Sequence, residues 1–339
     1  MSLELFLIQI LLNQGGVQNF NYLLKIIEKI INVEEIYLDS YLIEYHDELI
    51  KWKWKKNNNP AIAVFLYKSL LQSGNTDLII TDATTGANLS TMLAASNVGD
   101  CEIRATSTIA NATTLTIASG QTLTLGSSGA INNSGTLSNA GTLEFAASNS
   151  GLTATGSTTI GGTLTISADT TLTCTSALAI TNAFNIGGNT ITVAGTGNLS
   201  GGAITFNNGS SILKRTGAGT IANDLNLNTA SCKLDIDDAV TVSGDIAVAA
   251  NATIDFAGNT LTYSGDAIDV GANTLTMTGT GNFTNSNNIN LDNANSLIKL
   301  AGCTVKKINQ TGDAASSKGI DVATTASTIT TFTSAGQSR

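Results

Sequence analysis

Acidic side chains that could do chemistry recur at a fixed interval between Asp235 and Asp266. Asp235 and Asp255 lie 20 positions apart, and Asp245 and Asp266 lie 21 positions apart. If strands stack with this period, the members of each pair occupy adjacent strands, roughly 4.8 Å apart. A retaining glycosidase holds its two carboxyl groups about 5–5.5 Å apart. Asp235 and Asp255 are therefore the candidate catalytic residues if this chain cleaves glycosidic bonds.

The same stretch could instead bind calcium. Asp235, Asp237, Asp238 and Asp255, together with backbone carbonyls, offer the oxygen ligands that Ca²⁺ prefers. Like charges on neighbouring strands repel each other, so a cation would stabilise them. Aspartates that face water on a convex surface explain the pattern with no catalytic residue and no cofactor. The sequence leaves these three alternatives open.

Residues of other catalytic or metal sites are scarce or far apart. The only histidine is His46, which a Ser/His/Asp or Cys/His centre would have to use, and we expect it on the surface. Consecutive cysteines lie 58 to 73 positions apart, which is too far for a metal-binding motif. Each has an apolar residue two positions away, which predicts small core side chains. These cysteines are Cys101, Cys174, Cys232 and Cys303.

Charge is distributed unevenly and argues against a nucleic-acid partner. Residues 76–339 contain 9 Lys or Arg against 17 Asp or Glu, so they carry nearly all of the net charge of −9. A protein that binds nucleic acid needs a basic face to displace counterions from phosphates. We therefore expect other partners for this part of the chain.

Short apolar–polar–apolar triplets predict the elements that would position these residues. Examples are Leu115-Thr116-Ile117 and Leu123-Thr124-Leu125, and similar triplets follow along the chain with Gly, Asn, Ser or Ala in the gaps. In a strand, such a triplet directs two side chains inward and one outward. Residues 183–199 also resemble residues 267–283, at an offset of 84 positions. This offset equals four coils of about 21 residues with three strands each, and fixed periods indicate a solenoid.

The composition divides the chain near Ser73. Residues 1–75 hold 10 of the 17 aromatic residues but only 3 of the 33 glycines, with a helical pattern over 17–32 and a strand-like one over 36–54. The fold class that we expect is mainly β, a parallel β-helix with a small N-terminal α/β cap. We expect a cap or anchor over residues 1–75, a transition segment over 76–104 and a β-helix of some nine coils over 105–305. A polar tail over 306–339 caps or continues the β-helix.

Threonine spacing bears on one specialised function, ice binding, which requires a single flat plane of hydroxyls. Taken modulo 21, the Thr-x-Thr motifs fall at positions on all three faces of the predicted coil. We therefore expect no single threonine plane. The motifs begin at Thr114, Thr122, Thr163, Thr171, Thr190, Thr260 and Thr274.

The glycine-punctuated stretch at 133–145 resembles passenger regions of autotransporter and filamentous-haemagglutinin-type adhesins. The resemblance spans roughly residues 105–305 and implies a right-handed parallel β-helix outside the cell. Viral tail spikes share this architecture, and some cleave glycans. The resemblance implies a structural or adhesive stalk that binds a host receptor or surface glycan through a repetitive Thr/Asn/Ser face, with assembly into oligomers or end to end.

The start of the chain does not match a secretion signal. Residues 3–12 are apolar, but they lack a positively charged segment before them and contain Glu4. No stretch reaches the roughly 18 apolar residues of a membrane-spanning helix, so we expect no transmembrane span. Placement at a cell surface or on a virion therefore depends on the resemblance alone.

Overall fold

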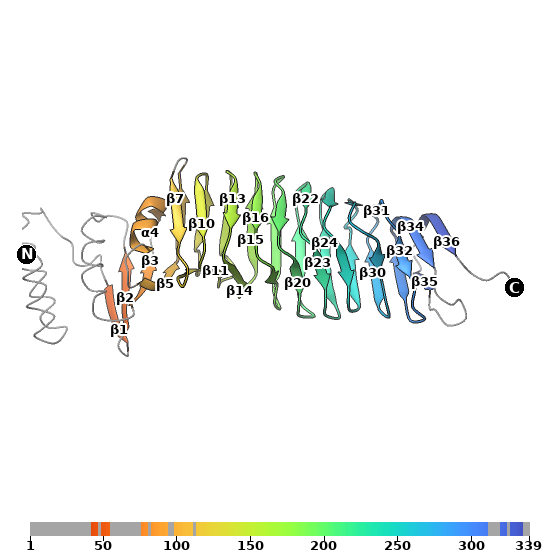
Figure 1. The fold of residues 1–339 in the computed structure, drawn as a ribbon, viewed down its shortest axis with the longest axis horizontal. Helices are drawn as coiled ribbons and strands as arrows, with labels where there is room; N and C mark the ends of the chain where they lie inside the picture. The colour runs from red at the N-terminus through yellow and green to blue at the C-terminus, as the bar shows by residue number, and fades with distance from the viewer. Residues whose placement is uncertain are drawn as a thin grey trace, which may run out of the picture.

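The chain forms an elongated stack of short, mostly parallel β-strands (Figure 1). The structure, a computed structural model, describes residues 42–46, 49–54, 76–80, 83–93, 98–110, 113–310, 319–323 and 326–334. The strands wind into a β-solenoid of about 11 turns with about 21 residues in each turn. The predicted fold class, a parallel β-helix with coils of this length, is confirmed.

Each full turn contributes one strand to each of three faces, which we call faces I, II and III. Face I contains β3 (Thr76–Ile80), β5 (Val98–Ile103), β8 (Thr122–Leu125), β11 (Thr142–Phe145), β14 (Thr163–Ile166), β17 (Phe184–Asn185), β20 (Ile204–Phe206), β23 (Leu225–Leu227), β26 (Ile246–Val248), β29 (Ile268–Asp269) and β32 (Ile289–Leu291).

Face II contains β4 (Thr84–Thr85), β6 (Thr106–Ile109), β9 (Ala130–Asn133), β12 (Gly151–Ala154), β15 (Thr170–Cys174), β18 (Thr190–Ala194), β21 (Ile212–Arg215), β24 (Cys232–Ile236), β27 (Ala252–Asp255), β30 (Thr274–Thr278), β33 (Leu297–Ala301) and β35 (Gly319–Val322).

Face III contains β7 (Thr114–Ile117), β10 (Thr136–Asn139), β13 (Thr158–Ile160), β16 (Leu178–Ile180), β19 (Leu199–Gly201), β22 (Gly219–Ile221), β25 (Val240–Val242), β28 (Thr260–Tyr263), β31 (Asn282–Asn285), β34 (Thr304–Gln310) and β36 (Thr328–Ser334). The long strand β34 turns a corner, since it pairs with β31 of face III and with β32 of face I.

Alternation within each strand builds the core. In β7 the side chains alternate between exposed and buried, and Leu115 and Ile117 point inward. Leu115 is the register partner of Leu137 in β10, one turn further on. Because each strand is hydrogen-bonded to the strand one turn away, apolar side chains stack in continuous inward columns along the axis. These columns form one hydrophobic cluster along the solenoid.

The corners depend on glycine where neighbouring turns come close. Gly195 has φ = 83°, and a Cβ added to it would lie 2.5 Å from the carbonyl oxygen of Cys174 in the preceding turn. Only glycine tolerates both this conformation and this separation. Asparagine side chains also link the corners of successive turns, as when Asn182 Nδ2 donates to the carbonyl oxygen of Gly161 at 3.0 Å.

The N-terminal end of the stack is covered. The helix α4 (Gly86–Leu93) packs against β6 and β7, and its Leu89 and Leu93 are fully buried. An antiparallel hairpin, β1 (Leu42–His46) and β2 (Leu49–Trp54), extends face I, because β2 pairs with β3. The strand-like pattern predicted over 36–54 contains this hairpin, whereas the helical pattern over 17–32 lies outside the described residues.

The stacked strands extend beyond residues 105–305 at both ends. The segment 76–104, predicted as a transition, supplies β3, β4, α4 and β5 to the stack, and the segment 306–339 supplies part of β34 together with β35 and β36. The described part of the tail thus continues the solenoid, one of the alternatives predicted for it, and the segment predicted as a transition also contributes strands to the stack. Among the described residues, no helix is long and apolar enough to cross a membrane.

Candidate functional site

The aspartates singled out by their spacing lie on face II in a ladder with two lysines. Lys214 of β21, Asp235 of β24 and Asp255 of β27 are successive register partners. All three occupy outward positions, because their strand neighbours Leu213, Leu234 and Ile254 point into the core. Strand alternation thus places Asp235 beside Asp255, as the sequence predicted.

Ion pairs connect the members of this ladder. Lys233 Nζ lies 2.9 Å from Asp255 Oδ2 and 3.4 Å from Asp235 Oδ1. Lys214 Nζ lies 2.5 Å from Asp237 Oδ2 and 3.6 Å from Asp235 Oδ2. Asp235 is therefore held between the two ammonium groups, and its side chain is only 12% exposed.

The pKa shifts follow from these contacts. Partial burial alone would raise the pKa of Asp255, but the hydrogen bond from Lys233, with help from the Ala257 N–H, brings it below its ordinary value. Burial alone would lower the pKa of Lys233, but its hydrogen bond to Asp255 and the nearby charges of Asp235 and Asp255 together raise it. The hydrogen bond to Asp237 is the main cause that raises the pKa of Lys214. These contacts therefore favour the charged forms of Lys214, Lys233 and Asp255.

This arrangement is poorly suited to acid catalysis or to a metal ion. A glycosidase needs a general acid with a raised pKa, whereas the pKa of Asp255 is lowered. Among the described residues, no group of three or more His, Cys, Asp or Glu side chains is placed to hold a metal. Asp237 pairs with Lys214, and the carboxylate of Asp238 accepts the neighbouring Ala239 N–H at 2.7 Å. Lysine ammonium groups thus pair with three of the four carboxylates considered for Ca²⁺, those of Asp235, Asp237 and Asp255.

The remaining aspartates of the predicted region lie at another corner of the coil. Asp245 and Asp266 occupy the connections between faces III and I. Asp245 Oδ1 accepts the backbone N–H of Asp266 at 2.8 Å, and Asp224 Oδ1 accepts that of Asp245 at 2.9 Å. The stretch from Asp235 to Asp266 is therefore divided between two places on the solenoid, and it does not form one acidic centre.

No protein-family model, curated protein or solved structure matches this chain. The resemblance to adhesin passenger regions therefore depends on the sequence pattern alone.

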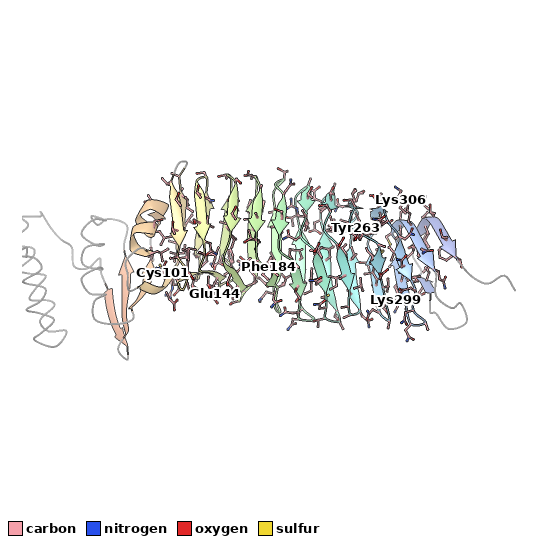
Figure 2. All side chains as sticks on the ribbon, viewed as in Figure 1. Cys101, Glu144, Phe184, Tyr263, Lys299 and Lys306 are labelled. Atoms are coloured by element: carbon pink, nitrogen blue, oxygen red, sulfur yellow. The ribbon has the colours of Figure 1, made fainter. Side chains whose placement is uncertain are left out.

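The most regular of these surfaces is face III. From β7 to β31, its strands contain no charged residue, in contrast to face II with Lys214 and Asp235 and to face I with Glu144. Figure 2 shows Lys306, which lies in β34 at the far end of face III. Small side chains, nearly all with a hydroxyl group, follow one another along this face.

These side chains form two outward columns. In the first, successive register partners are Thr116, Ser138, Thr159, Ala179 and Ser200. In the second they are Thr220, Thr241, Thr262 and Thr284. The columns are offset by two residues, because Leu199 pairs with Ile221 where they meet. We call these nine residues the hydroxyl face.

Counting with a fixed period did not reveal the hydroxyl face. Successive partners are 20 to 22 residues apart, as from Thr159 to Ala179 and from Thr262 to Thr284, so a fixed period of 21 drifts. The Thr-x-Thr motifs are distributed over all three faces, as expected. Those that begin at Thr114, Thr122 and Thr171 lie in β7 of face III, β8 of face I and β15 of face II. In the sequence, the hydroxyl face is marked by a single Thr or Ser between two apolar residues of one strand, as in Leu115-Thr116-Ile117.

Two further groups of residues concern the core. All four cysteines are free and buried, which confirms them as core residues.

Arg215 is also fully buried, and its Nη2 donates to the carbonyl oxygens of Gly195 at 2.9 Å and Gly197 at 2.7 Å. Alternation along β21 places Arg215 inward, because it lies two positions after the inward Leu213. Its guanidinium links neighbouring turns at the corner between faces II and III.

Proposed function

We propose that this protein is a surface-exposed or extracellular structural stalk that binds a polar, repetitive surface, such as a glycan, through its hydroxyl face. The observation that carries the proposal is the pair of uncharged hydroxyl columns on face III. Parallel strands repeat at roughly 4.8 Å, so every turn of the hydroxyl face except the one that contains Ala179 offers one hydroxyl group at that spacing. A hydroxyl both donates and accepts hydrogen bonds, which suits neutral sugar hydroxyls.

The binding mode that we propose is distributed and has no single catalytic centre. One hydroxyl contributes little, because a typical hydrogen bond nets only about 0.5–1.5 kcal/mol against water. A column that engages several turns at once gains affinity through multivalency. The ligand class that fits is an extended neutral polysaccharide, since face III carries no charge from β7 to β31 to recognise an anionic one.

Two double variants test the proposal. Thr241→Glu/Thr262→Glu places two charges on adjacent register partners of the hydroxyl face. The matched control, Thr253→Glu/Thr276→Glu, places the same charges on adjacent partners of face II. Retention on a panel of insoluble neutral polysaccharides should fall at least about tenfold for the first variant and stay unchanged for the control.

The competing function is cleavage of a glycan by Asp235 and Asp255. The ion pairs to Lys214 and Lys233 weigh against it, because they hold both carboxylates as structural partners. Incubation of the protein with the same polysaccharides measures new reducing ends directly. Turnover that Asp235→Asn or Asp255→Asn abolishes would overturn the structural proposal, as would wild-type protein that is retained on none of the polysaccharides.

A further inference from the structure

Each turn of face III presents two outward side chains, two positions apart in the sequence. Thr114 comes two positions before Thr116, and it pairs with Thr136 just as Thr116 pairs with Ser138. Side chains two positions apart in a strand point to the same side of the sheet. The strands of face III lie side by side along the molecule (Figure 1). Face III therefore carries two parallel rows of side chains, and the hydroxyl face is only part of them.

The offset between β19 and β22 joins the two columns of the hydroxyl face into these rows. It brings Asn198 beside Thr220, and the Thr220 N–H donates to Asn198 Oδ1 at 3.1 Å. It also brings Ser200 beside Ala222, whose N–H donates to the carbonyl oxygen of Leu199 at 2.8 Å. Both rows therefore continue without a break from β7 to β31 and the residue that follows it.

Small, uncharged side chains fill both rows, and seven residues in each row carry a hydroxyl group. We call the two rows together the double row. The first row contains Thr114, Thr136, Ser157, Ala177, Asn198, Thr220, Thr241, Thr262 and Thr284, and the second contains Thr116, Ser138, Thr159, Ala179, Ser200, Ala222, Ser243, Ser264 and Ser286.

The fold uses few of these hydroxyl groups. Hydroxyls at the corners link successive turns, as when Thr155 Oγ1 donates to the carbonyl oxygen of Asn133 at 3.0 Å. Within the double row, which the structure describes completely, only two hydroxyls take part in hydrogen bonds. Thr284 Oγ1 lies 3.3 Å from the carbonyl oxygen of Leu261 and 3.2 Å from Thr262 Oγ1. The remaining hydroxyls keep their donors and acceptors for a partner outside the protein.

Backbone pairing fixes the spacing of the double row in two directions. Adjacent turns lie roughly 4.8 Å apart along each row, and two residues of one strand separate the rows by about 6.6 Å. Nine turns at this spacing give rows roughly 40 Å long. In the prism planes of ice, water molecules repeat at nearly these two distances. The double row is therefore a regular array of hydroxyls with a repeat close to that of a crystal plane of water.

We propose that the double row binds ice, with its hydroxyls in the place of lattice water molecules. A hydroxyl donates and accepts hydrogen bonds as water does, so it can occupy such a position. A single polysaccharide chain needs only one row, whereas two rows in register fit a partner that is ordered in two directions. The partner is also neutral, because the strands of face III carry no charge from β7 to β31. Many weak contacts on one rigid array add up to stable adsorption.

The Thr-x-Thr motifs of the sequence predicted no single plane of hydroxyls. The double row nevertheless forms a continuous hydroxyl surface, because it combines Thr with Ser and follows the pairing register of 20 to 22 residues. Ice is a different ligand from the polysaccharide proposed above, and the two share only the hydroxyl face.

The test is the growth of single ice crystals in a solution of the full chain. Wild-type protein should give faceted crystals and a gap between the melting and freezing temperatures that widens with protein concentration. Thr241→Tyr/Thr262→Tyr places two bulky rings on adjacent partners of the first row and should reduce this gap at least about tenfold, because the array no longer reaches the crystal plane at several turns at once. The matched control, Thr253→Tyr/Thr276→Tyr, places the same rings on adjacent partners of face II and should behave as wild type.

A second measurement keeps the proposal testable if the first double variant does not fold. Slow freezing of a stirred solution should enrich wild-type protein in the ice fraction, and Ser138→Tyr, in the second row, should lower that enrichment. Rounded wild-type crystals with no temperature gap, or equal gaps for the two double variants, would overturn the proposal. Retention on polysaccharides is measured separately with the same proteins. Wild-type protein that is retained there but leaves ice unshaped would overturn ice binding alone, and the converse result would overturn the polysaccharide ligand alone.

Discussion

Replacement of Gly195 by alanine measures how tightly successive turns are packed. Gly195 and Gly120 share nearly the same left-handed conformation, with φ of 83° and 81°. A Cβ at Gly120 meets no atom within 4 Å, whereas at Gly195 it lies 2.5 Å from the carbonyl oxygen of Cys174 and 2.9 Å from the carbonyl carbon. The two substitutions therefore share a conformational cost and differ in contact with the neighbouring turn.

The expected magnitudes follow from these distances. Alanine in the left-handed region costs about 1–2 kcal/mol, and about 0.4–1 kcal/mol is regained because the unfolded chain is restricted. Gly120→Ala should therefore lower the free energy of unfolding by about 1 kcal/mol. At Gly195 the neighbouring turn must also move, and overpacking adds about 1–3 kcal/mol. Gly195→Ala should therefore cost about 2–4 kcal/mol in total.

Urea unfolding followed by far-UV circular dichroism measures the two variants side by side. Repeat proteins can unfold in parts, so hydrogen exchange at β15 and β18, on either side of the contact, provides a local measure. Faster exchange there should accompany Gly195→Ala and be absent for Gly120→Ala. Equal losses of stability, or a larger loss at Gly120, would refute the account of the corner.

Two further predictions concern the charged ladder and the buried thiols. A double-mutant cycle of Lys233→Met and Asp255→Asn should give a coupling of about 0.5–1 kcal/mol, modest because both groups are about one-third exposed. Because the pKa of Asp255 is lowered, this stabilisation should be present above the ordinary aspartate pKa and disappear as pH falls through the lowered pKa. A coupling energy that persists at still lower pH would contradict the ion pair. Burial raises the pKa of Cys174 to about 11, and all four cysteines are buried, so iodoacetamide at pH 8 should leave the folded chain unlabelled. Rapid alkylation of the native protein would contradict this prediction, because it would show that the thiols are accessible.

Much of the fold could be predicted because the alternation of apolar and polar residues within each strand shows which side chains point inward and which point outward. The triplet Leu115-Thr116-Ile117 shows which side chains point inward, and the resemblance between 183–199 and 267–283 shows the length of the coil. The ends were harder to predict, because β3 and β36 lack the repeated triplet pattern. Their place in the stack is determined by pairing with β5 and β34.

The candidate site was predictable only in part. The spacing of Asp235 and Asp255 placed them on adjacent strands, and the structure confirms this neighbourhood. The sequence could not show that Lys214 and Lys233 lie within ion-pair distance, because long side chains reach across turns of variable length. The spacing of 20 to 22 residues from one register partner to the next also prevents a fixed period of 21 from aligning the residues of the hydroxyl face.

A rod whose turns bond only to their neighbours can change length in whole units. The two related segments at 183–199 and 267–283 lie four turns apart, so recombination between their coding sequences would add or remove those turns without altering the strands on either side. Each such event would lengthen or shorten the molecule by about 19 Å at roughly 4.8 Å per turn. Reach can therefore evolve separately from the surface chemistry of the turns that remain.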